Sequence, residues 1–295
     1  MDDEKYLIGT NGWLFLKNDT NRIIDQVTGR YALTDDVVHS WLNLLRLRDA
    51  YFKSKGINYF YICAPNKECV YSQYLPPEIE ISEKRPINII KDVFEKILDN
   101  RFSYPVMDLK NNEFNTFSKG DTHWNHYGAY VAYKIMMAKI GVSRVIERSD
   151  IQFIPLRRKG DLISKHDRTS LDEVICASIK IPADISVEFD NKVVNRGKLT
   201  VINNPLALND ESLLIFRDSF GSCLSHFLAR TFRRVVMVWQ PNIDFGIVEV
   251  ELPDYVISEQ VERFIVSPPN DITDLSNNQL SRSKIKDCKL YYDIP

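Results

Sequence analysis

Asp121 and His123 are the residues of this chain whose types and spacing point most directly to chemistry. In an extended segment, side chains two positions apart leave the backbone on the same side, so both can line one wall of a cavity. The carboxylate can then accept an imidazole N–H and fix the tautomer, which supplies the orienting acid and the general base of a nucleophilic triad. For the pair taken alone, the alternative is a surface loop in which Asp121 caps a turn and His123 is solvated.

A metal site is a second interpretation of the same stretch, because Asp121, His123 and His126 offer three ligands. Mixed carboxylate and imidazole ligands are chemically reasonable, but the sequence nearby holds no cysteine or further histidine to complete a site. We therefore expect no metal ion and no required cofactor. The remaining histidines are expected to be structural or solvated: His39, His166 and His226.

Ser219 is the candidate nucleophile, because Arg217-Asp218-Ser219-Phe220-Gly221 predicts a sharp turn between an apolar strand and a helix. Such a turn projects the hydroxyl from the sheet edge and places it beside the unpaired N–H groups of a helix start, which can stabilise developing negative charge. A serine needs a neighbouring base to act as a nucleophile, and His123 would supply it. Helix capping by Asp218 or Ser219 is the alternative.

The elements that must position these residues alternate between helices and strands. In the first half of the chain, segments with the apolar periodicity of a helix alternate with apolar runs that are typical of buried strands. The same alternation resumes towards residue 264. The predicted helices cover 34–55, 87–98, 127–141 and 259–264, and the predicted strands cover 57–64, 104–109, 213–216, 234–239 and 255–258. This alternation predicts a parallel sheet covered on both faces, with ligands at the carboxyl ends of the strands.

We expect a single domain over residues 1–295. Two of its segments depart from the alternation of helices and strands. Residues 142–209 alternate apolar and polar positions with turn signals between them, which predicts a β-rich antiparallel hairpin insertion. This insertion is either a flap that shapes the substrate site or a subdomain that only packs. Residues 267–295 form a polar C-terminal tail that either wraps the domain or is mobile.

Composition excludes several classes of protein. A net charge of −2 gives no basic field for nucleic acid, and five scattered cysteines without C-x-x-C spacing fit reduced thiols. The acidic start of the chain is not a signal peptide, and no apolar run approaches the roughly 20 residues of a membrane-spanning helix. We therefore expect a cytoplasmic protein without a transmembrane segment.

Five motifs together resemble the SGNH-hydrolase-like proteins of bacterial alginate acetylation and the related DHHW-type proteins. In chain order they are GWLF (12–15), APNK (64–67), DTHW (121–124), RDSF (217–220) and PDYVI (253–257). The resemblance implies an α/β, flavodoxin-like three-layer sandwich with a parallel sheet, permuted so that the Asp/His block precedes the Ser block. It also implies Ser219 as nucleophile, His123 as base and Asp121 as orienter. The D-x-H spacing follows the alginate branch, whereas other SGNH enzymes have D-x-x-H, and no Gly-x-Asn-Asp block completes an oxyanion hole.

The resemblance implies a carbohydrate O-acetyltransferase that modifies a bacterial surface or capsular polysaccharide through an acetyl-serine intermediate. An acetylesterase with the same triad and a non-catalytic glycan-binding or assembly subunit are the alternatives. Acetyl-CoA is the simplest donor for a cytoplasmic protein, and association with glycan-synthesis machinery is a further expectation. Trp239 is a candidate for stacking on sugar, and Arg263 either contacts substrate or forms a surface salt bridge. We expect substrate contacts from four other residues: Arg217, Trp124, Gln260 and Lys67.

Overall fold

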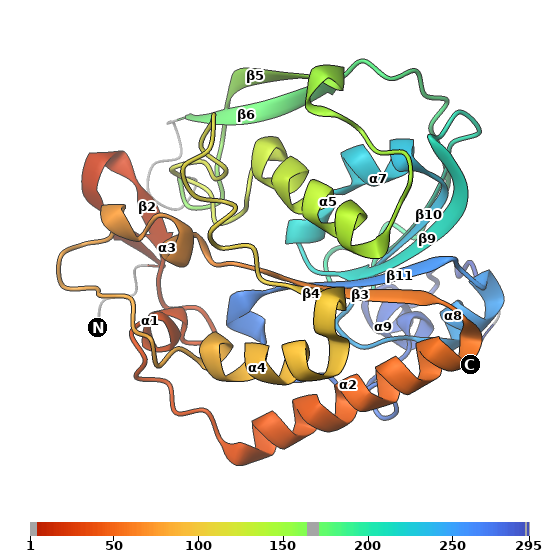
Figure 1. Ribbon diagram of the computed structural model, residues 1–295, viewed down its shortest axis with the longest axis horizontal. Coiled ribbons are helices and arrows are strands. Elements are labelled where there is room, and N and C mark those ends of the chain that lie inside the picture. The colour runs from red at the N-terminus through yellow and green to blue at the C-terminus, as the bar shows by residue number, and fades with distance from the viewer. Residues whose placement is uncertain (1–4, 164–170, 293, 295) are drawn as a thin grey trace.

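A seven-stranded sheet lies between two layers of helices, with α5 and α7 on one face and α2, α4 and α8 on the other (Figure 1). The computed structural model describes residues 5–163, 171–292 and 294. Each face of the sheet has its own hydrophobic core, so the strands between them are buried on both sides. The predicted α/β three-layer sandwich is confirmed.

The order of the strands in this sheet is β4-β3-β11-β9-β10-β8-β7. The first five strands in that order run parallel, whereas β8 is antiparallel to β10 and β7 is antiparallel to β8. The carboxyl ends of the parallel strands therefore share one edge. The bounds of the seven strands are β3 Asn58–Ala64, β4 Phe102–Ser103, β7 Ser186–Asp190, β8 Leu199–Asn203, β9 Asn209–Arg217, β10 Phe232–Trp239 and β11 Tyr255–Val261.

The long helices follow the apolar stripes of the sequence. Helix α2 (Asp35–Lys55) buries Trp41 and Phe52 and ends at Gly56, whose φ of 68° suits a residue without a side chain. Helix α5 (His126–Ile140) begins at an Asn125 cap, whose side chain accepts the Tyr127 and Gly128 N–H groups. The other α-helices are α1 Ile23–Val27, α3 Lys67–Val70, α4 Pro86–Leu98, α7 Ser225–Thr231, α8 Phe245–Glu251 and α9 Asn277–Lys284.

Short 3-10 turns connect these elements at η1 Thr10–Gly12, η2 Ser72–Tyr74, η3 Asp99–Arg101, η4 Arg148–Asp150, η5 Phe220–Ser222 and η6 Glu262–Phe264. Two predicted elements near such turns are wrong. Residues 104–109 form a turn after the two-residue strand β4, because Pro105 has no N–H and the Leu109 N–H bonds back to the Pro105 carbonyl. The predicted helix over 259–264 is wrong for its first half, because residues 259–261 continue β11, pair with β3 and are buried, whereas Glu262–Phe264 form the 3-10 turn η6.

The region from 142 to 209 supplies two different antiparallel structures. Strands β5 (Ile151–Arg158) and β6 (Asp172–Ile179) form a hairpin that packs on α5, where Phe153 contacts Tyr127 edge to face. Strands β7 and β8 instead extend the central sheet at the edge beyond β10. A further pair, β1 (Tyr6–Ile8) with β2 (Leu14–Leu16), precedes the first long helix.

The polar tail packs on the domain. Helix α9 begins with a capping box formed by Ser276 and Gln279, and Asn278 donates to the carbonyls of Tyr292 and Ile294. Asn277 donates to the Gln240 side chain just after β10. The tail therefore helps to fix the loop that follows β10 at the carboxyl edge of the sheet.

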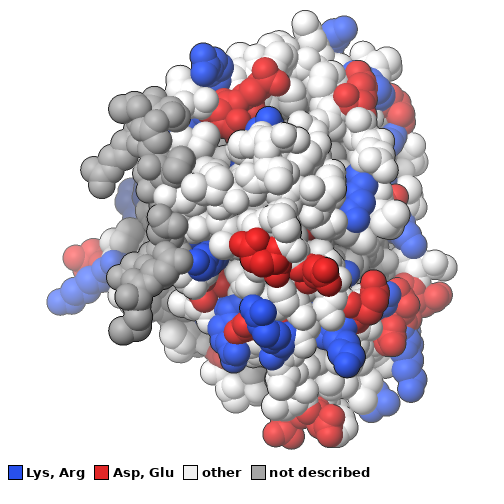
Figure 2. Space-filling view, turned by 90° about the vertical axis from the view of Figure 1, so that its left-hand side faces the viewer, with Lys and Arg blue, Asp and Glu red and all other residues white. Residues whose placement is uncertain are grey.

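The surface carries both signs of charge. Lys and Arg side chains are interspersed with Asp and Glu side chains on the face drawn in Figure 2, which agrees with the net charge of −2. Within the part of the chain that the structure describes, no helix combines the length and the apolar character that crossing a membrane requires.

Candidate active site

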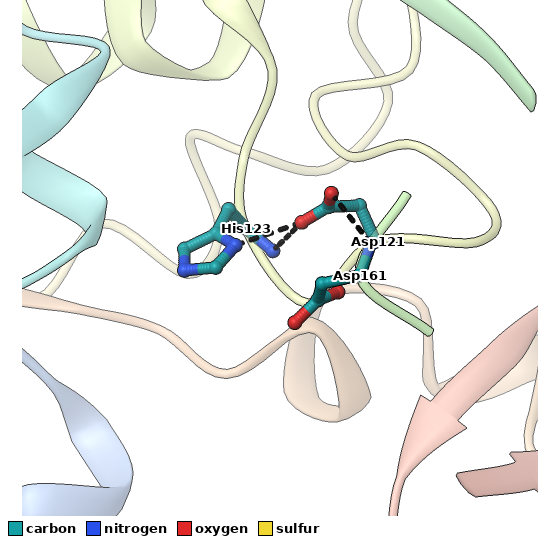
Figure 3. A group of neighbouring side chains, drawn as sticks. All are labelled: Asp121, His123 and Asp161. Atoms are coloured by element: carbon teal, nitrogen blue, oxygen red, sulfur yellow. Dashed lines mark hydrogen bonds and ion pairs between the residues drawn. The ribbon is translucent and has the colours of Figure 1, made fainter. Parts of the chain in front are cut away.

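His123 joins two residues that lie far apart in the sequence. Its Nδ1 is 2.8 Å from Asp121 Oδ1, and its Nε2 is 2.8 Å from Ser219 Oγ. Figure 3 shows the Asp121 carboxylate directed at the His123 ring. Burial favours the neutral acid, but the hydrogen bond and charge of His123 hold the pKa of Asp121 below its ordinary value. The imidazole is thus oriented by a carboxylate and faces a hydroxyl, as a general base requires.

The loop that carries Asp121 and His123 is held on both sides. Trp124 pairs with Phe117 in an isolated antiparallel bridge, and Asn125 caps α5 directly after it. Gly128 packs so closely that an added Cβ would lie 2.3 Å from the Thr116 carbonyl oxygen. The His123 backbone N–H also donates to Asp121 Oδ1 at 2.9 Å, which fixes the carboxylate relative to the loop.

Ser219 lies on the turn between β9 and η5. Asp218 holds this turn, because its Oδ1 accepts the Phe220 N–H at 2.8 Å and its Oδ2 accepts the Val261 N–H of β11 at 2.7 Å. Trp124 Nε1 donates to the Phe220 carbonyl at 2.8 Å, which ties the Ser219 turn to the His123 loop. The two halves of the candidate triad are therefore joined by a buried bond as well as by the His123–Ser219 contact.

The sequence predicts unpaired backbone N–H groups beside Ser219, but not all of those at this turn are unpaired. The Phe220 N–H donates to Asp218 Oδ1 at 2.8 Å, and the Gly221 backbone packs against the Glu259 carboxyl group. The Ser219 N–H has no acceptor among the residues that the structure describes. The Ser219 N–H can therefore receive developing negative charge, whereas the Phe220 N–H is already engaged.

A cleft of about 660 Å³ opens in front of His123 and Ser219 at the carboxyl ends of β9, β10 and β11. Its lining includes Arg217, Trp239 and Gln260, one from each of these three strands. Gln260 Oε1 accepts the Tyr61 hydroxyl at 2.6 Å, which leaves the Nε2 donors for the cleft side. Arg263 also lines the cleft, with its Nε 3.8 Å from Asp19 Oδ2, so it forms an ion pair at the cleft wall and not on the open surface.

Arg217 is a largely buried cation at the wall of this cleft. Its guanidinium lies 4.2 Å from the centre of the Trp239 ring, and its Nη1 donates to the Asp218 carbonyl and to Ser222 Oγ. Burial lowers the pKa of Arg217 to about 10, against the opposing charges of Glu259 and Asp218. The stacking leaves the Trp239 ring half-buried and part of the cleft lining.

Lys67 anchors the loop that carries Asp121. Its Nζ donates to the backbone carbonyls of Ser118, Lys119 and Asp121 at 3.4, 3.0 and 2.6 Å. The side chain is only 1% exposed, and burial lowers the pKa of Lys67 to about 8 although nearby carboxylates favour the ammonium form. A buried cation thus binds three carbonyl groups next to the candidate triad.

Replacing Lys67 by Met is expected to reduce kcat about tenfold to hundredfold with little change in KM, because the unsupported loop misplaces Asp121 and His123. Steady-state kinetics on an acetyl ester measure the effect. Lys119→Met is the matched control, since Lys119 Nζ donates only to the Asn11 carbonyl at the surface in the interactions described. Equal losses in both variants would contradict an anchoring role for Lys67.

The sequence model of the SGNH hydrolase-like domain of the acetyltransferase AlgX matches residues 7–181, more than half of the chain. The chain belongs to this family. The match includes Lys67, Asp121 and His123, and it ends before Ser219 and Gln260. No curated protein sequence matches the chain.

Solved structures extend the likeness of this AlgX-family chain to nearly its whole length. Bacillus cereus PatB1 has a TM-score of 0.66 at 15% identity, covering 88% of this chain and 96% of that chain. A DHHW family protein from Eubacterium siraeum has a TM-score of 0.62 at 17% identity, covering 90% and 96%. The O-acetyltransferase domain of Pseudomonas putida AlgJ has a TM-score of 0.58 at 15% identity, covering 94% and 99%. At these identities the likeness is one of fold.

Two of the residues expected to contact substrate lie beneath the cleft. Trp124 is 1% exposed and packs edge to face on Phe220, because its position between a β-bridge and a helix cap turns the ring into the core. Lys67 is buried below the loop and is not part of the cleft lining. Both therefore hold the loops of this AlgX-family site, whereas Arg217 and Gln260 line the cleft, where contact with substrate stays a prediction.

His126, the third ligand of the alternative metal site, points away from Asp121. His126 Nδ1 accepts the Ala177 N–H at 3.0 Å and its ring meets His226, so it faces β6 and not Asp121. Burial lowers the pKa of His126 to about 4, which keeps it neutral. The proposed Asp121–His123–His126 metal trio is therefore not formed. His39 is exposed, and His166 lies outside the described residues.

Asp161 is a site residue that sequence reasoning missed. Its carboxylate accepts the Thr122 N–H at 2.7 Å and the Thr122 hydroxyl at 2.8 Å, and its own N–H donates to Asp121 Oδ2 at 3.1 Å. Asp161 belongs to the segment over 142–209 that the sequence predicts as an insertion. Only the folded chain brings it close to Asp121 and His123 (Figure 3). Ligand atoms of Asp121, His123 and Asp161 lie within 4.8 Å of one another, but these bonds already engage their oxygens and the His123 Nδ1.

Proposed function

We propose that this AlgX-family protein is a carbohydrate O-acetyltransferase that acts through an acetyl-serine intermediate. The observation that carries the proposal is the hydrogen-bonded chain Asp121–His123–Ser219 at the wall of an open cleft. Membership of an acetyltransferase family and the fold shared with the AlgJ O-acetyltransferase domain support acetyl transfer as the reaction.

In the first step, Ser219 Oγ attacks the carbonyl carbon of an acetyl donor while His123 Nε2 takes the hydroxyl proton. The donor's leaving group departs with that proton, and the acetyl group remains as an ester on Ser219. His123 then removes the proton from a sugar hydroxyl, which attacks the ester and regenerates Ser219. Asp121 stabilises the imidazolium that forms in each step.

The Ser219 N–H and the Gln260 side-chain amide are the proposed oxyanion donors. The Ser219 N–H has no acceptor among the described residues, and the Tyr61 hydroxyl orients the Gln260 amide from behind. Donors already fixed before reaction cost no reorganisation when charge develops. This pair takes the place of the Gly-x-Asn-Asp block that the sequence lacks.

The proposed acceptor is a bacterial surface or capsular glycan. The half-buried Trp239 ring and the polar groups of Asn195, Asn21 and Thr20 in the cleft lining suit the apolar faces and hydroxyls of sugars. Acetyl-CoA in the cytoplasm is the donor that we propose to test first, and association with glycan-synthesis machinery is part of the same proposal.

The proposal is tested by incubating the protein with p-nitrophenyl acetate or acetyl-CoA, with and without oligosaccharide acceptors. We expect an acetylated oligosaccharide by mass spectrometry and faster donor consumption when the right acceptor is present. Donor consumption that no acceptor changes, without an acetylated product, would identify an acetylesterase. Glycan binding without consumption of either donor would identify a non-catalytic subunit.

A further inference from the structure

Glu259 is a fully buried acid directly behind the candidate nucleophile. It lies on β11, which pairs with β9 up to the Ser258–Phe216 position. Its Oε2 accepts the Asp218 N–H at 3.1 Å, and the same oxygen packs against the Gly221 backbone. One carboxyl group therefore holds the backbone on both sides of Ser219.

Gly221 packs directly against the Glu259 carboxyl group. A Cβ added to Gly221 would lie 2.9 Å from Glu259 Oε2 and 2.7 Å from Arg217 Cβ. Only glycine lets the turn approach the carboxyl group so closely. The other oxygen, Oε1, is buried and has no hydrogen-bond partner in the described part of the chain.

The charges around Glu259 decide its protonation state. The Asp218 carboxyl group already accepts two backbone N–H groups, from Phe220 and Val261. Two interacting buried carboxyl groups cannot both ionise cheaply. Burial, followed by the charge of Asp218, raises the pKa of Glu259 well above its ordinary value, while the hydrogen bond from the Asp218 N–H and the charge of Arg217 oppose this effect. Tyr61, Cys63 and Glu262 are the other titratable groups that face this region.

We propose that Glu259 is a positioning residue that holds the Ser219 turn as a neutral carboxylic acid. This inference rests on the proposed role of Ser219 for its effect on activity, but the protonation of Glu259 is measurable without it. The neutral acid accepts the Asp218 N–H without adding a second negative charge beneath a hydroxyl that must become an electron-rich nucleophile.

Glu259→Gln is the test variant, because glutamine keeps an accepting oxygen and carries no charge. We expect it to retain kcat/KM within about threefold near neutral pH, whereas Glu259→Ala loses the two contacts and at least about tenfold in kcat/KM. As the pH rises, wild-type activity on an acetyl ester should fall when Glu259 ionises, and Glu259→Gln should keep its activity further into the alkaline range.

Thermal unfolding gives a readout that does not depend on activity. A carboxyl group whose folded-state pKa is raised adds stability below its unfolded pKa and loses it as the pH rises through the folded value. Wild type should therefore lose stability relative to Glu259→Gln as the pH increases. Glu262→Gln is the matched control, since Glu262 is also buried but pairs with Arg85 at 3.1 Å, so loss of its charge should destabilise the fold at neutral pH.

The proposal is overturned if the unfolding temperatures of wild type and Glu259→Gln change equally with pH. That result would mean that Glu259 carries no proton in the folded protein. A Glu259→Gln variant that folds normally but is as inactive as Glu259→Ala would overturn it as well. If neither acetyl transfer nor ester hydrolysis occurs in the wild type, the proposed function fails, and the unfolding measurements still decide the state of Glu259.

Discussion

Ser219→Ala should lower acetyl transfer by about a thousandfold or more, with KM for the donor nearly unchanged. The hydroxyl that His123 Nε2 contacts at 2.8 Å is lost, and no acetyl-enzyme can form. The cleft lining otherwise stays in place, so ground-state binding persists. Intact-protein mass spectrometry after a short incubation with the donor should show an added acetyl group on the wild type and none on the variant.

Ser225→Ala is the control for this result. Ser225 is a half-buried serine at the start of α7 whose hydroxyl donates to the Ser222 carbonyl, so its removal should leave turnover unchanged. A sulfonyl fluoride reagent offers a second measurement, since it should label wild type and Ser225→Ala but not Ser219→Ala. Full acetyl transfer by Ser219→Ala would end the nucleophile assignment.

Asp121→Asn should lower kcat by roughly a thousandfold to ten-thousandfold, because the amide does not hold the His123 tautomer with Nε2 free to accept the Ser219 proton. The hydrogen bond of 2.8 Å between Asp121 Oδ1 and His123 Nδ1 is the contact that is altered. The pH dependence should also change, since the imidazolium formed in the reaction loses its negative partner. Steady-state kinetics across pH on an acetyl ester measure both effects.

Asp161→Asn provides the comparison, because its carboxylate accepts from Thr122 and stands beside the same loop. Its replacement perturbs the loop without removing the partner of His123 Nδ1, so we expect a loss of about tenfold or less. Similar losses in the two aspartate variants would show that loop order, not the orientation of His123, limits the rate.

Much of this fold was readable from the sequence because the signals were local. The apolar stripes of α2 and α4 and the capping residue Asn125 set the helices, and the run ending at Ala64 set the central strand β3. The end of β11 is predicted wrongly as a helix, because the polar Glu259 and Gln260 lack the apolar character of a buried strand. Their burial depends on strands from distant parts of the chain.

The residues of the candidate site also fall into two groups: those that the local sequence indicates and those that only the tertiary fold brings to the site. Asp121, His123 and Ser219 have types and local turns that indicate chemistry, and the structure places them in hydrogen-bond contact. Asp161, Glu259 and the anchoring role of Lys67 depend on tertiary neighbours. A buried lysine under three carbonyls has the same local sequence signal as a solvated lysine in a loop, so spacing alone could not reveal it.

Strand β11 is synthesised after the other six strands of the central sheet, yet it lies between β3 and β9 in the middle of that sheet. A nascent chain that has not yet released residues 255–261 from the ribosome has both halves of the candidate triad but lacks the strand that joins them. The Val261 N–H that holds Asp218, and with it the Ser219 turn, arrives with that strand. Competence for chemistry should therefore appear only after β11 has been synthesised, and slow insertion of a central strand is the step at which folding is expected to be most vulnerable.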